Sequence, residues 1–244
     1  MKKLSKPTKE DLYGVENKEV LEDMWDQQFS STYKLKEISP STLEYFNSIN
    51  KRFKNGVMLD VGCGAGRNKK FFEDSGWVCY GTDITKEGLK IASKSTPINL
   101  VHALAHKLPF KDNMFDLVFC WRVLHNISYK VRKKSVFEMS LVLKQNGNLV
   151  ICVQSLNDPS TLEKYMNNGI ELSEDKNSWV VNQKIGDKIM PYVKHFYSKE
   201  DIQTEIEHDT DLKIVTIDEI WGRSGLESVG RKVQRYWIVE AKKK

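Results

Sequence analysis

Short apolar runs along the chain alternate with stretches in which apolar residues recur at helical spacing. The runs have the length and composition of buried strands, and lie at residues 57–61, 77–82, 98–102, 115–121 and 148–153. Helical spacing predicts a helix after the first run, another over about 86–95 and a third over about 129–144, which Asn146-Gly147 would end. Strands that alternate with helices predict an α/β fold, with right-handed crossovers and a parallel sheet covered on both faces.

Both ends of the chain add helices to this pattern. Val20, Leu21, Met24 and Trp25 repeat at helical spacing and predict a helix over about 17–29. A second helix opens at Pro40, with Ser39 or Ser41 as its N-cap. Near the C-terminus the sequence predicts a helix over 198–207 with Ser198 as its N-cap, and two strands at 212–220 and 233–241.

The pattern changes after Gln154. Residues 156–196 show little regular apolar periodicity and contain several turn signals, such as Asn157-Asp158-Pro159 and Asn167-Asn168-Gly169. This segment is too long for a plain connection inside a compact domain. We interpret it as an insertion that forms a lid or a wall of a substrate pocket.

A glycine-rich turn follows the first strand and carries the clearest chemical signal. Its pattern is Asp60-x-Gly62-x-Gly64-x-Gly66, directly before a predicted helix. Glycine permits positive φ and lets a ligand approach the main chain, while the helix N-terminus presents free N–H groups. A dinucleotide fingerprint would need glycine at Arg67, and a phosphate-binding loop would need Gly-Lys-Ser/Thr, so neither fits.

An acidic residue ends the second strand and suits the same ligand. Asp83 lies 21 residues after Gly62, where a carboxylate can accept both hydroxyls of a ribose at the switch point of the sheet. The alternative is an N-cap role, because a helix begins just after Thr85. The two roles are compatible.

These motifs resemble those of the class I S-adenosylmethionine-dependent methyltransferases, in particular the small-molecule group. The glycine turn resembles their first motif, and Leu108-Pro109-Phe110 with Phe115-Asp116-Leu117-Val118 resembles a second. The resemblance implies a seven-stranded sheet in the order 3-2-1-4-5-7-6, with strand seven antiparallel, and S-adenosylmethionine as cofactor. It also implies that residues 1–53 form a helical segment or lid, and residues 54–244 the methyltransferase domain with the insertion at about 156–196.

The resemblance implies a set of cofactor contacts around the turn and the strand ends. They are Asp60, Gly62, Cys63, Gly64, Gly66, Arg67, Asp83, Ile84, Leu104, Ala105 and Cys120, with Asn68 beside Arg67. Leu104 departs from the family pattern, which often places an acid there to accept from the adenine amino group. The main-chain N–H of Ala105 could still reach the ring.

His125 is the candidate catalytic residue, either as a general base or as a substrate contact near the methyl group. The alternative is a structural histidine that caps the next turn.

Candidate substrate contacts are Trp25, Tyr33, Arg122, Tyr192, His195 and Arg223. No metal site is expected, because His102 and His106 lie on a strand-to-loop segment and not on one helix face.

Composition and charge limit the cellular location and the partners that we expect. Four scattered cysteines without a Cys-x-x-Cys pair predict reduced, buried thiols. No apolar leader or membrane-spanning run is present, so we expect a soluble, cytoplasmic protein that does not bind membranes. The net charge of +5 is spread along the chain, which makes a nucleic-acid partner less favoured than a small molecule.

Three functions remain open at the level of sequence. The first is methyl transfer to oxygen or nitrogen of a small-molecule acceptor. The second is RNA modification of the wobble-uridine methyltransferase type, which shares the later motifs. The third is a non-catalytic subunit that uses the cofactor fold to bind a partner.

Overall fold

The computed structural model describes residues 6–7, 17–32, 38–95, 99–185, 188–222 and 234–244. Its main sheet has seven strands in the order β3-β2-β1-β4-β5-β10-β9. The strands are β1 (Val57–Val61), β2 (Val78–Asp83), β3 (Leu100–His102), β4 (Phe115–Trp121), β5 (Leu143–Gln154), β9 (Leu212–Gly222) and β10 (Gln234–Lys243). The pairs among β1 to β5 are parallel, whereas β10 runs antiparallel to both of its neighbours. The predicted fold class and strand order are confirmed.

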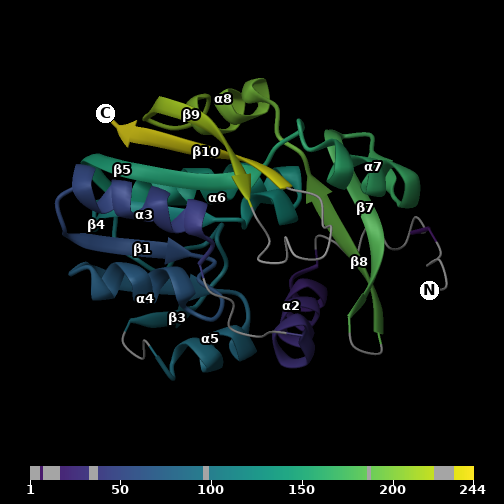
Figure 1. Ribbon diagram of the computed structural model, residues 1–244, viewed down its shortest axis with the longest axis horizontal. Coiled ribbons are helices and arrows are strands. Elements are labelled where there is room, and N and C mark those ends of the chain that lie inside the picture. The colour runs from purple at the N-terminus through teal and green to yellow at the C-terminus, as the bar shows by residue number, and fades with distance from the viewer. Residues whose placement is uncertain (1–5, 8–16, 33–37, 96–98, 186–187, 223–233) are drawn as a thin grey trace.

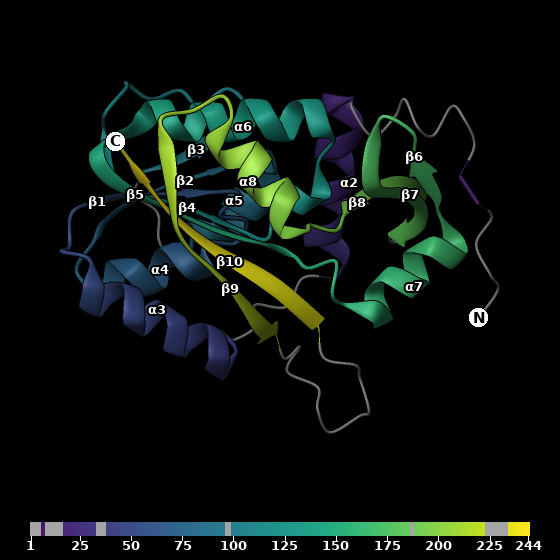
Figure 2. The same ribbon diagram turned by 90° about the horizontal axis from the view of Figure 1, so that it is seen from above.

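Helices cover both faces of this sheet, as Figure 2 shows from above. One face carries α3 (Pro40–Arg52) and α4 (Arg67–Asp74), and the other carries α6 (Tyr129–Val142) and α8 (Lys199–Glu207). The short helix α5 (Lys86–Ala92) packs against β2 and β3 at the sheet edge. The layers are therefore helix, sheet and helix, as the alternating pattern predicts.

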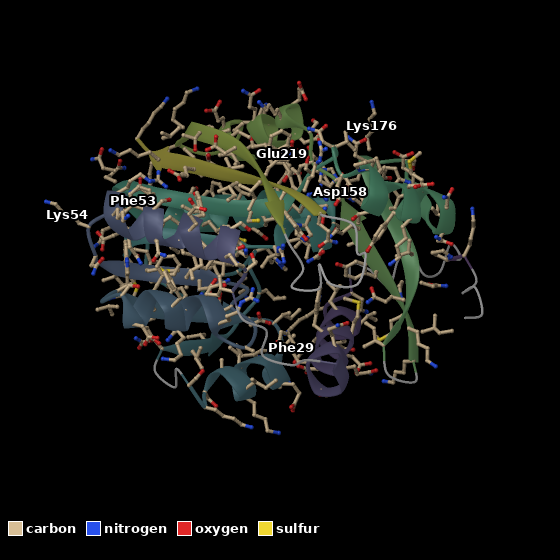
Figure 3. The ribbon with its side chains drawn as sticks, in the orientation of Figure 1. Phe29, Phe53, Lys54, Asp158, Lys176 and Glu219 are labelled. Carbon is tan, nitrogen blue, oxygen red and sulfur yellow. The ribbon has the colours of Figure 1, made fainter. Side chains whose placement is uncertain are left out.

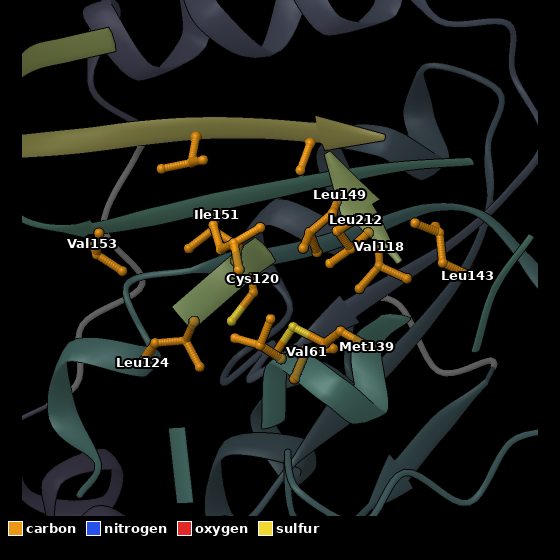
Figure 4. Packing of buried hydrophobic residues seen from close by; sticks show 14 of the residues in the cluster. Val61, Val118, Cys120, Leu124, Met139, Leu143, Leu149, Ile151, Val153 and Leu212 are labelled. Carbon is orange, nitrogen blue, oxygen red and sulfur yellow. The ribbon is translucent and has the colours of Figure 1, made fainter. Parts of the chain in front are cut away.

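The alternation of side chains along β4 divides the core in two. Phe119 and Trp121 pack with Phe46 of α3 on one face. Val118 and Cys120 point to the other face, where Figure 4 shows them among apolar side chains near α6. A strand buried on both faces is apolar over its buried length, which explains the apolar run over residues 117–121 that follows the partly exposed Asp116.

Two predicted helix caps are confirmed. The Ser39 Oγ accepts a hydrogen bond from the main-chain N–H of Thr42 at 3.4 Å and starts α3. Ser198 and Asp201 form a capping box at the start of α8, each side chain accepting from the other residue's main-chain N–H.

The predicted end of the helix over 129–144 is wrong. The helix ends two residues earlier, and β5 begins at once with Leu143, which pairs with Phe115. Regular pairing with β4 resumes at Asn148, so the residues between form a bulge that contains Asn146 at φ 63°. The Asn-Gly signal is real but marks this bulge, because pairing with β4 holds the chain in the sheet on both sides of it.

Residues 156–196 have regular structure that their weak apolar periodicity does not predict. The segment forms α7 (Pro159–Asn168) and the strands β6 (Ile170–Leu172), β7 (Asp175–Ile185) and β8 (Lys188–His195). These strands make a separate antiparallel sheet in the order β6-β7-β8. Lysines, turn residues and Pro191 obscure the strand periodicity, and Pro191 is tolerated because β8 is an edge strand.

The helix α2 (Lys18–Thr32) lies between this second sheet and the edge of the main domain (Figure 1). On one side, Leu21 and Met24 belong to an apolar cluster with residues of α7, β7 and β8. On the other side, the Asp26 carboxylate accepts from the main-chain N–H of Glu87 in α5 at 3.0 Å. The helix therefore joins the second sheet to the main domain.

A buried ionic network ties the second sheet to the main domain from the opposite side. The guanidinium of Arg132 in α6 donates two hydrogen bonds to Asp175 of β7, at 2.8 and 2.9 Å. Its Nε donates to Glu205 of α8 at 2.9 Å, and the Tyr197 hydroxyl donates to the same carboxylate at 2.9 Å. Burial would raise the pKa of Asp175, but Arg132 outweighs it and holds that pKa below its ordinary value.

Replacing Arg132 by Met should lower the free energy of unfolding by about 3–5 kcal/mol, because two carboxylates stay buried without their cation. Urea denaturation at neutral pH measures this change. The matched control is Lys133→Met on the same helix, which removes an ion pair with the exposed Asp209 and should change stability little. Equal effects of the two substitutions would contradict the structural role of the network.

Candidate active site

The glycine turn has the conformation that its spacing predicts. Gly62, Gly64 and Gly66 have φ angles of 73°, 51° and 78°, and Gly66 is the N-cap of α4. The main-chain N–H groups of Gly62 and Cys63 both donate to the carbonyl of Thr82, at 2.7 and 2.9 Å. The end of β2 therefore fixes the turn, and side chains other than hydrogen would be strained at its positive φ positions.

A cavity of about 350 Å³ opens beside this turn, at the carboxyl ends of the parallel strands. Ligands of open α/β sheets bind in this place. Its walls come from α2, the glycine turn, the end of β2, the segment after β3 and the segment after β4. The lining residues are Lys18, Leu21, Trp25, Phe29, Gly62, Gly64, Thr82, Asp83, Ile84, Thr85, Ala103, Leu104, Ala105, His106, Trp121, Arg122, Val123, Asn126, Ile127 and Val131.

Asp83 lies at the cavity wall, and its carboxylate can accept further hydrogen bonds. One carboxylate oxygen accepts from the main-chain N–H of Gly64 at 2.7 Å. The other accepts from the N–H and the hydroxyl of Thr85, at 2.9 and 2.7 Å. A carboxylate has about four acceptor sites, so these three bonds orient it and leave room for a ligand hydroxyl. Asp83 thus combines the local structural role with the geometry that ribose binding needs.

Asp60 is a buried carboxyl group whose charge Lys69 and Arg67 offset only in part. Its side chain is fully buried, and neither oxygen has a hydrogen-bond partner among the described residues. Burial, and secondarily the charge of Asp83, raises its pKa to about 7. A cation beside it would relieve this cost, so the residues fit a ligand with an ammonium group such as the methionine end of S-adenosylmethionine.

The helix α2 closes the cavity over the turn. A Cβ placed on Gly64 would lie 2.8 Å from Cζ of Phe29, so the aromatic ring rests directly on the turn. Figure 3 labels Phe29 near the point where α2 faces the main domain. Trp25 lines the same cavity and meets the ring of Tyr192 edge-on at 5.9 Å. Phe29 and Trp25 of α2 therefore form a roof, meaning that they cover the cavity on the side of the glycine turn.

The apolar side of the cavity suits a flat ring. Ile84, Leu104 and Ala105 line it together with His106. The pKa of His106 is lowered, first by burial and then by Lys134, which favours the neutral ring. Leu104 offers no side-chain acceptor, as its departure from the family pattern implies.

The opposite end of the cavity is polar and joins the second sheet. Asn126, after β4, accepts through Oδ1 from the Tyr192 hydroxyl and from Nζ of Lys194 at 3.1 Å. Its Nδ2 donates to the carbonyl of Arg122 at 2.9 Å. Arg122 itself lines the cavity at φ 65°. Asn126 therefore connects the strand ends of both sheets at this point.

The structure brings some predicted site residues to the cavity and places others around it. Those on the cavity wall are Gly62, Gly64, Asp83, Ile84, Leu104, Ala105, Trp25 and Arg122. Those that surround the turn without lining the cavity are Asp60, Cys63, Gly66, Arg67 and Cys120. Tyr33 and Arg223 lie outside the described residues. Tyr192 borders a smaller adjacent cavity that shares Trp25 with the first.

His125 lies beneath the cavity wall and not on it. Its ring is 2% exposed, and Nδ1 accepts from the main-chain N–H of Gln154 at 3.0 Å. This bond assigns the neutral tautomer with the proton on Nε2. Burial, followed by the charges of Lys194 and Arg122, holds its pKa well below the ordinary value. These contacts support the structural alternative, and a catalytic role for His125 stays a prediction.

His195 belongs to the ionic network and not to the cavity. Its Nδ1 lies 2.8 Å from the Ser178 hydroxyl, which donates to Asp175. Burial, and then Arg132, lowers its pKa to about 3, so the ring is neutral. Its place in the fold points to positioning of β8, although it was a candidate substrate contact by sequence.

Several wall residues escaped the sequence analysis. Phe29 and Thr85 carry signals that could have found them, since Phe29 continues the apolar face of α2 and Thr85 follows Asp83. Asn126 on the wall carries none, and neither does Lys194, which bonds to Asn126 but does not line the cavity, because only the meeting of the two sheets makes them neighbours.

The described part of the chain shows neither a metal-binding cluster nor a membrane-spanning helix. No group of three or more His, Cys, Asp or Glu residues is placed to hold a metal ion within those ranges. None of the described helices is long and apolar enough to cross a membrane. The four cysteines are buried and unpaired, as predicted.

Comparison with solved structures supports the class that the fold and the glycine turn define. An S-adenosylmethionine-dependent methyltransferase from Methanosarcina mazei aligns with a TM-score of 0.67 at 17% identity, over 85% of this chain and 99% of its own. The 1,6-didemethyltoxoflavin N1-methyltransferase of Burkholderia thailandensis, solved with its substrate and S-adenosylhomocysteine, aligns with a TM-score of 0.55 at 15% identity, over 82% and 76%. The chain therefore has the fold of the class I S-adenosylmethionine-dependent methyltransferases.

The sequence comparisons agree with this class over the middle of the chain. Residues 59–151 match the family model described as a methyltransferase domain. The methyltransferase YcgJ of Bacillus subtilis is 32% identical over 116 residues, which is 45% of this chain and 45% of YcgJ. Demethylmenaquinone methyltransferase of Staphylococcus aureus is 36% identical over 111 residues, 42% of this chain and 44% of that protein. The chain thus spans less than half the length of these relatives. The fold and the matched methyltransferase region indicate S-adenosylmethionine as the cofactor.

The buried carboxyl of Asp60 makes a pH-dependent prediction for the protein without cofactor. Its pKa of about 7 in the folded state exceeds the ordinary value, so the folded state binds more protons than the unfolded state between about pH 4 and 7. Stability should therefore fall as the pH rises through this window, and level off above it. Relative to the wild type, Asp60→Asn should become progressively more stable between pH 5 and 8, as urea denaturation measures. A stability difference that does not change with pH would contradict this prediction.

Proposed function

We propose that this protein is an S-adenosylmethionine-dependent methyltransferase that methylates oxygen or nitrogen of a small molecule. The observation that carries the proposal is the roofed cavity beside the glycine turn. Phe29 and Trp25 cover it from α2, while Asn126 connects its far end to β8. A cavity of about 350 Å³ with walls on several sides is of the size that encloses small ligands.

Different residues at and around the cavity would contact different parts of the cofactor. Asp83 would accept the ribose hydroxyls, Ile84 and Ala105 would pack against the adenine, and Asp60 would balance the ammonium charge. The bound cofactor supplies a methyl group on a sulfonium ion, which is already electrophilic. The protein would then act mainly by holding the acceptor in line with that methyl group and by excluding water.

The RNA-modifying alternative needs an open surface that tracks a phosphate backbone. The roof formed by α2 and the attachment of the second sheet favour a small acceptor over a polynucleotide. The acceptor class remains a proposal, as do the cytoplasmic location and the 1–53 and 54–244 division of the chain.

Asp83→Asn tests the cofactor role. We expect it to weaken S-adenosylhomocysteine binding by about 10- to 100-fold, because a hydrogen bond to a charged group contributes about 1.5–3 kcal/mol. Isothermal titration calorimetry measures the affinity, and thermal unfolding shows whether the variant still folds. Asp112→Asn, on an exposed loop, is the matched control and should bind like the wild type.

Three results would count against the proposal. No binding of S-adenosylhomocysteine by the wild type would leave the non-catalytic reading. Unchanged affinity in a folded Asp83→Asn variant would remove the ribose contact. The third result has two parts. The protein would bind tRNA tightly and in a salt-sensitive way, and a radiolabelled methyl screen would show no transfer to any phenol, amine or carboxylic acid. Together these would favour the RNA enzyme.

His125→Ala separates its two roles. A base or substrate contact would lower methyl transfer in the same screen by about tenfold or more, with cofactor affinity nearly unchanged. A structural histidine would instead lower the unfolding midpoint, because Gln154 loses a buried acceptor, and would leave turnover of the folded fraction unchanged.

A further inference from the structure

Two basic residues lie at the polar end of the cavity, and among the described residues neither forms an ion pair with an acid: Arg122 lines the cavity, and Lys194 bonds to Asn126 on its wall. Arg122 follows β4 and lines the cavity, while Lys194 lies on β8 and is 8% exposed. None of the ion pairs in the described ranges involves either residue. Lys194 is buried and Arg122 is half-buried, and buried cations are normally paired, so this arrangement is unusual for a site that serves structure alone.

Arg122 is held in place but not neutralised. Its guanidinium carbon lies 4.0 Å above the centre of the Tyr236 ring. Its Nε is buried and has no hydrogen-bond partner among the described residues. The main chain of Arg122 has a φ angle of 65°, which residues other than glycine rarely adopt. The tertiary structure therefore fixes an arginine with an unused donor at the cavity wall.

Within the described ranges, the side chain of Lys194 hydrogen-bonds to a neutral amide and not to a carboxylate. Its Nζ donates to Oδ1 of Asn126 at 3.1 Å, and Asn126 also bonds to the main chain of Arg122. Burial, followed by the charge of Arg122, lowers the pKa of Lys194 to about 7. The carboxylate of Asp158 acts on Lys194 from beyond ion-pair distance, and accepts instead from Gln154, Thr161 and the main chain of Arg235. The potential at this end of the cavity is therefore positive.

From the unpaired Arg122, the buried Lys194 and the apolar walls beside them, we propose that this protein methylates a small organic acid, whose carboxylate binds at Arg122 and Lys194. This inference rests on the proposed function and names its acceptor class. Arginine presents a planar set of donors that matches a carboxylate. The neighbouring wall residues Trp25, Val123 and Ile127 suit an apolar or aromatic body.

A carboxylate bound at Arg122 could instead belong to the cofactor, because the methionine end of the cofactor also carries a carboxylate. The two sources differ in a measurable way. If Arg122 held the cofactor carboxylate, its loss would weaken S-adenosylhomocysteine but not 5′-methylthioadenosine, which lacks the amino-acid portion. If Arg122 binds the acceptor, its loss leaves the affinity for both nucleosides within about twofold of the wild type.

The test is calorimetric titration of the protein saturated with S-adenosylhomocysteine. The probes are benzoate and indole-3-acetate, each compared with its neutral amide of nearly the same shape. We expect the acids to bind about tenfold or more tightly than the amides. Arg122→Met should abolish this preference, and Lys194→Met should reduce it. Lys130→Met, at an exposed position, is the control and should retain it.

Several outcomes would overturn the inference. They are no binding of either acid, equal binding of acid and amide, or a preference that survives in both folded variants. Selective loss of S-adenosylhomocysteine affinity in Arg122→Met would also overturn it, by assigning the arginine to the cofactor. If the wild type fails to bind S-adenosylhomocysteine, the proposed function falls as well, whereas failure of the acids in a protein that binds it removes this inference alone.

Discussion

The buried guanidinium of Arg132 is the interaction on which the geometry of the site depends most. It bonds to Asp175 of the second sheet and Glu205 of α8, and thereby holds the small antiparallel sheet against the main domain. With that sheet fixed, its apolar side packs on α2, and α2 in turn covers the glycine turn with Phe29. Arg132 also donates to the carbonyl of Ile127 on the cavity wall, so the network lies next to the cavity that the second sheet and α2 help to enclose.

Buried charge is arranged differently in the two ends of the cavity. Asp60 and Asp83 supply acidic groups at the end near the glycine turn, and Asp60 lacks a partner among the described residues. Arg122 and Lys194 supply basic groups at the end near β8. Each end is electrostatically incomplete by itself, and a ligand with charges of the opposite sign would complete it. The Arg132 network, where both charges are paired, shows what a purely structural arrangement looks like in the same protein.

Sequence reasoning succeeded where local chemistry and burial agree. The apolar runs gave the main strands, the glycine spacing gave the turn conformation, and Ser39 and Ser198 gave helix starts. It failed where pairing between distant segments overrides local preference. Leu143 is a strand residue because Phe115 pairs with it, although its own neighbours are typical of a helix end. The strands of residues 170–195 were missed because their lysines and Pro191 weaken the alternation that the second sheet reveals.

The sequence by itself determined the α/β class, the glycine turn with Asp60 and Asp83, and the family resemblance that residues 59–151 bear out. These features follow from apolar periodicity and from fixed spacings along the chain, such as the 21 residues between Gly62 and Asp83. Only the tertiary structure decided that Phe29 roofs the turn, that His125 lies beneath the wall, and that Lys194 meets Asn126. Those neighbours are separated by tens of residues along the chain, and no periodicity or spacing encodes a contact that arises only when two sheets and a helix pack together.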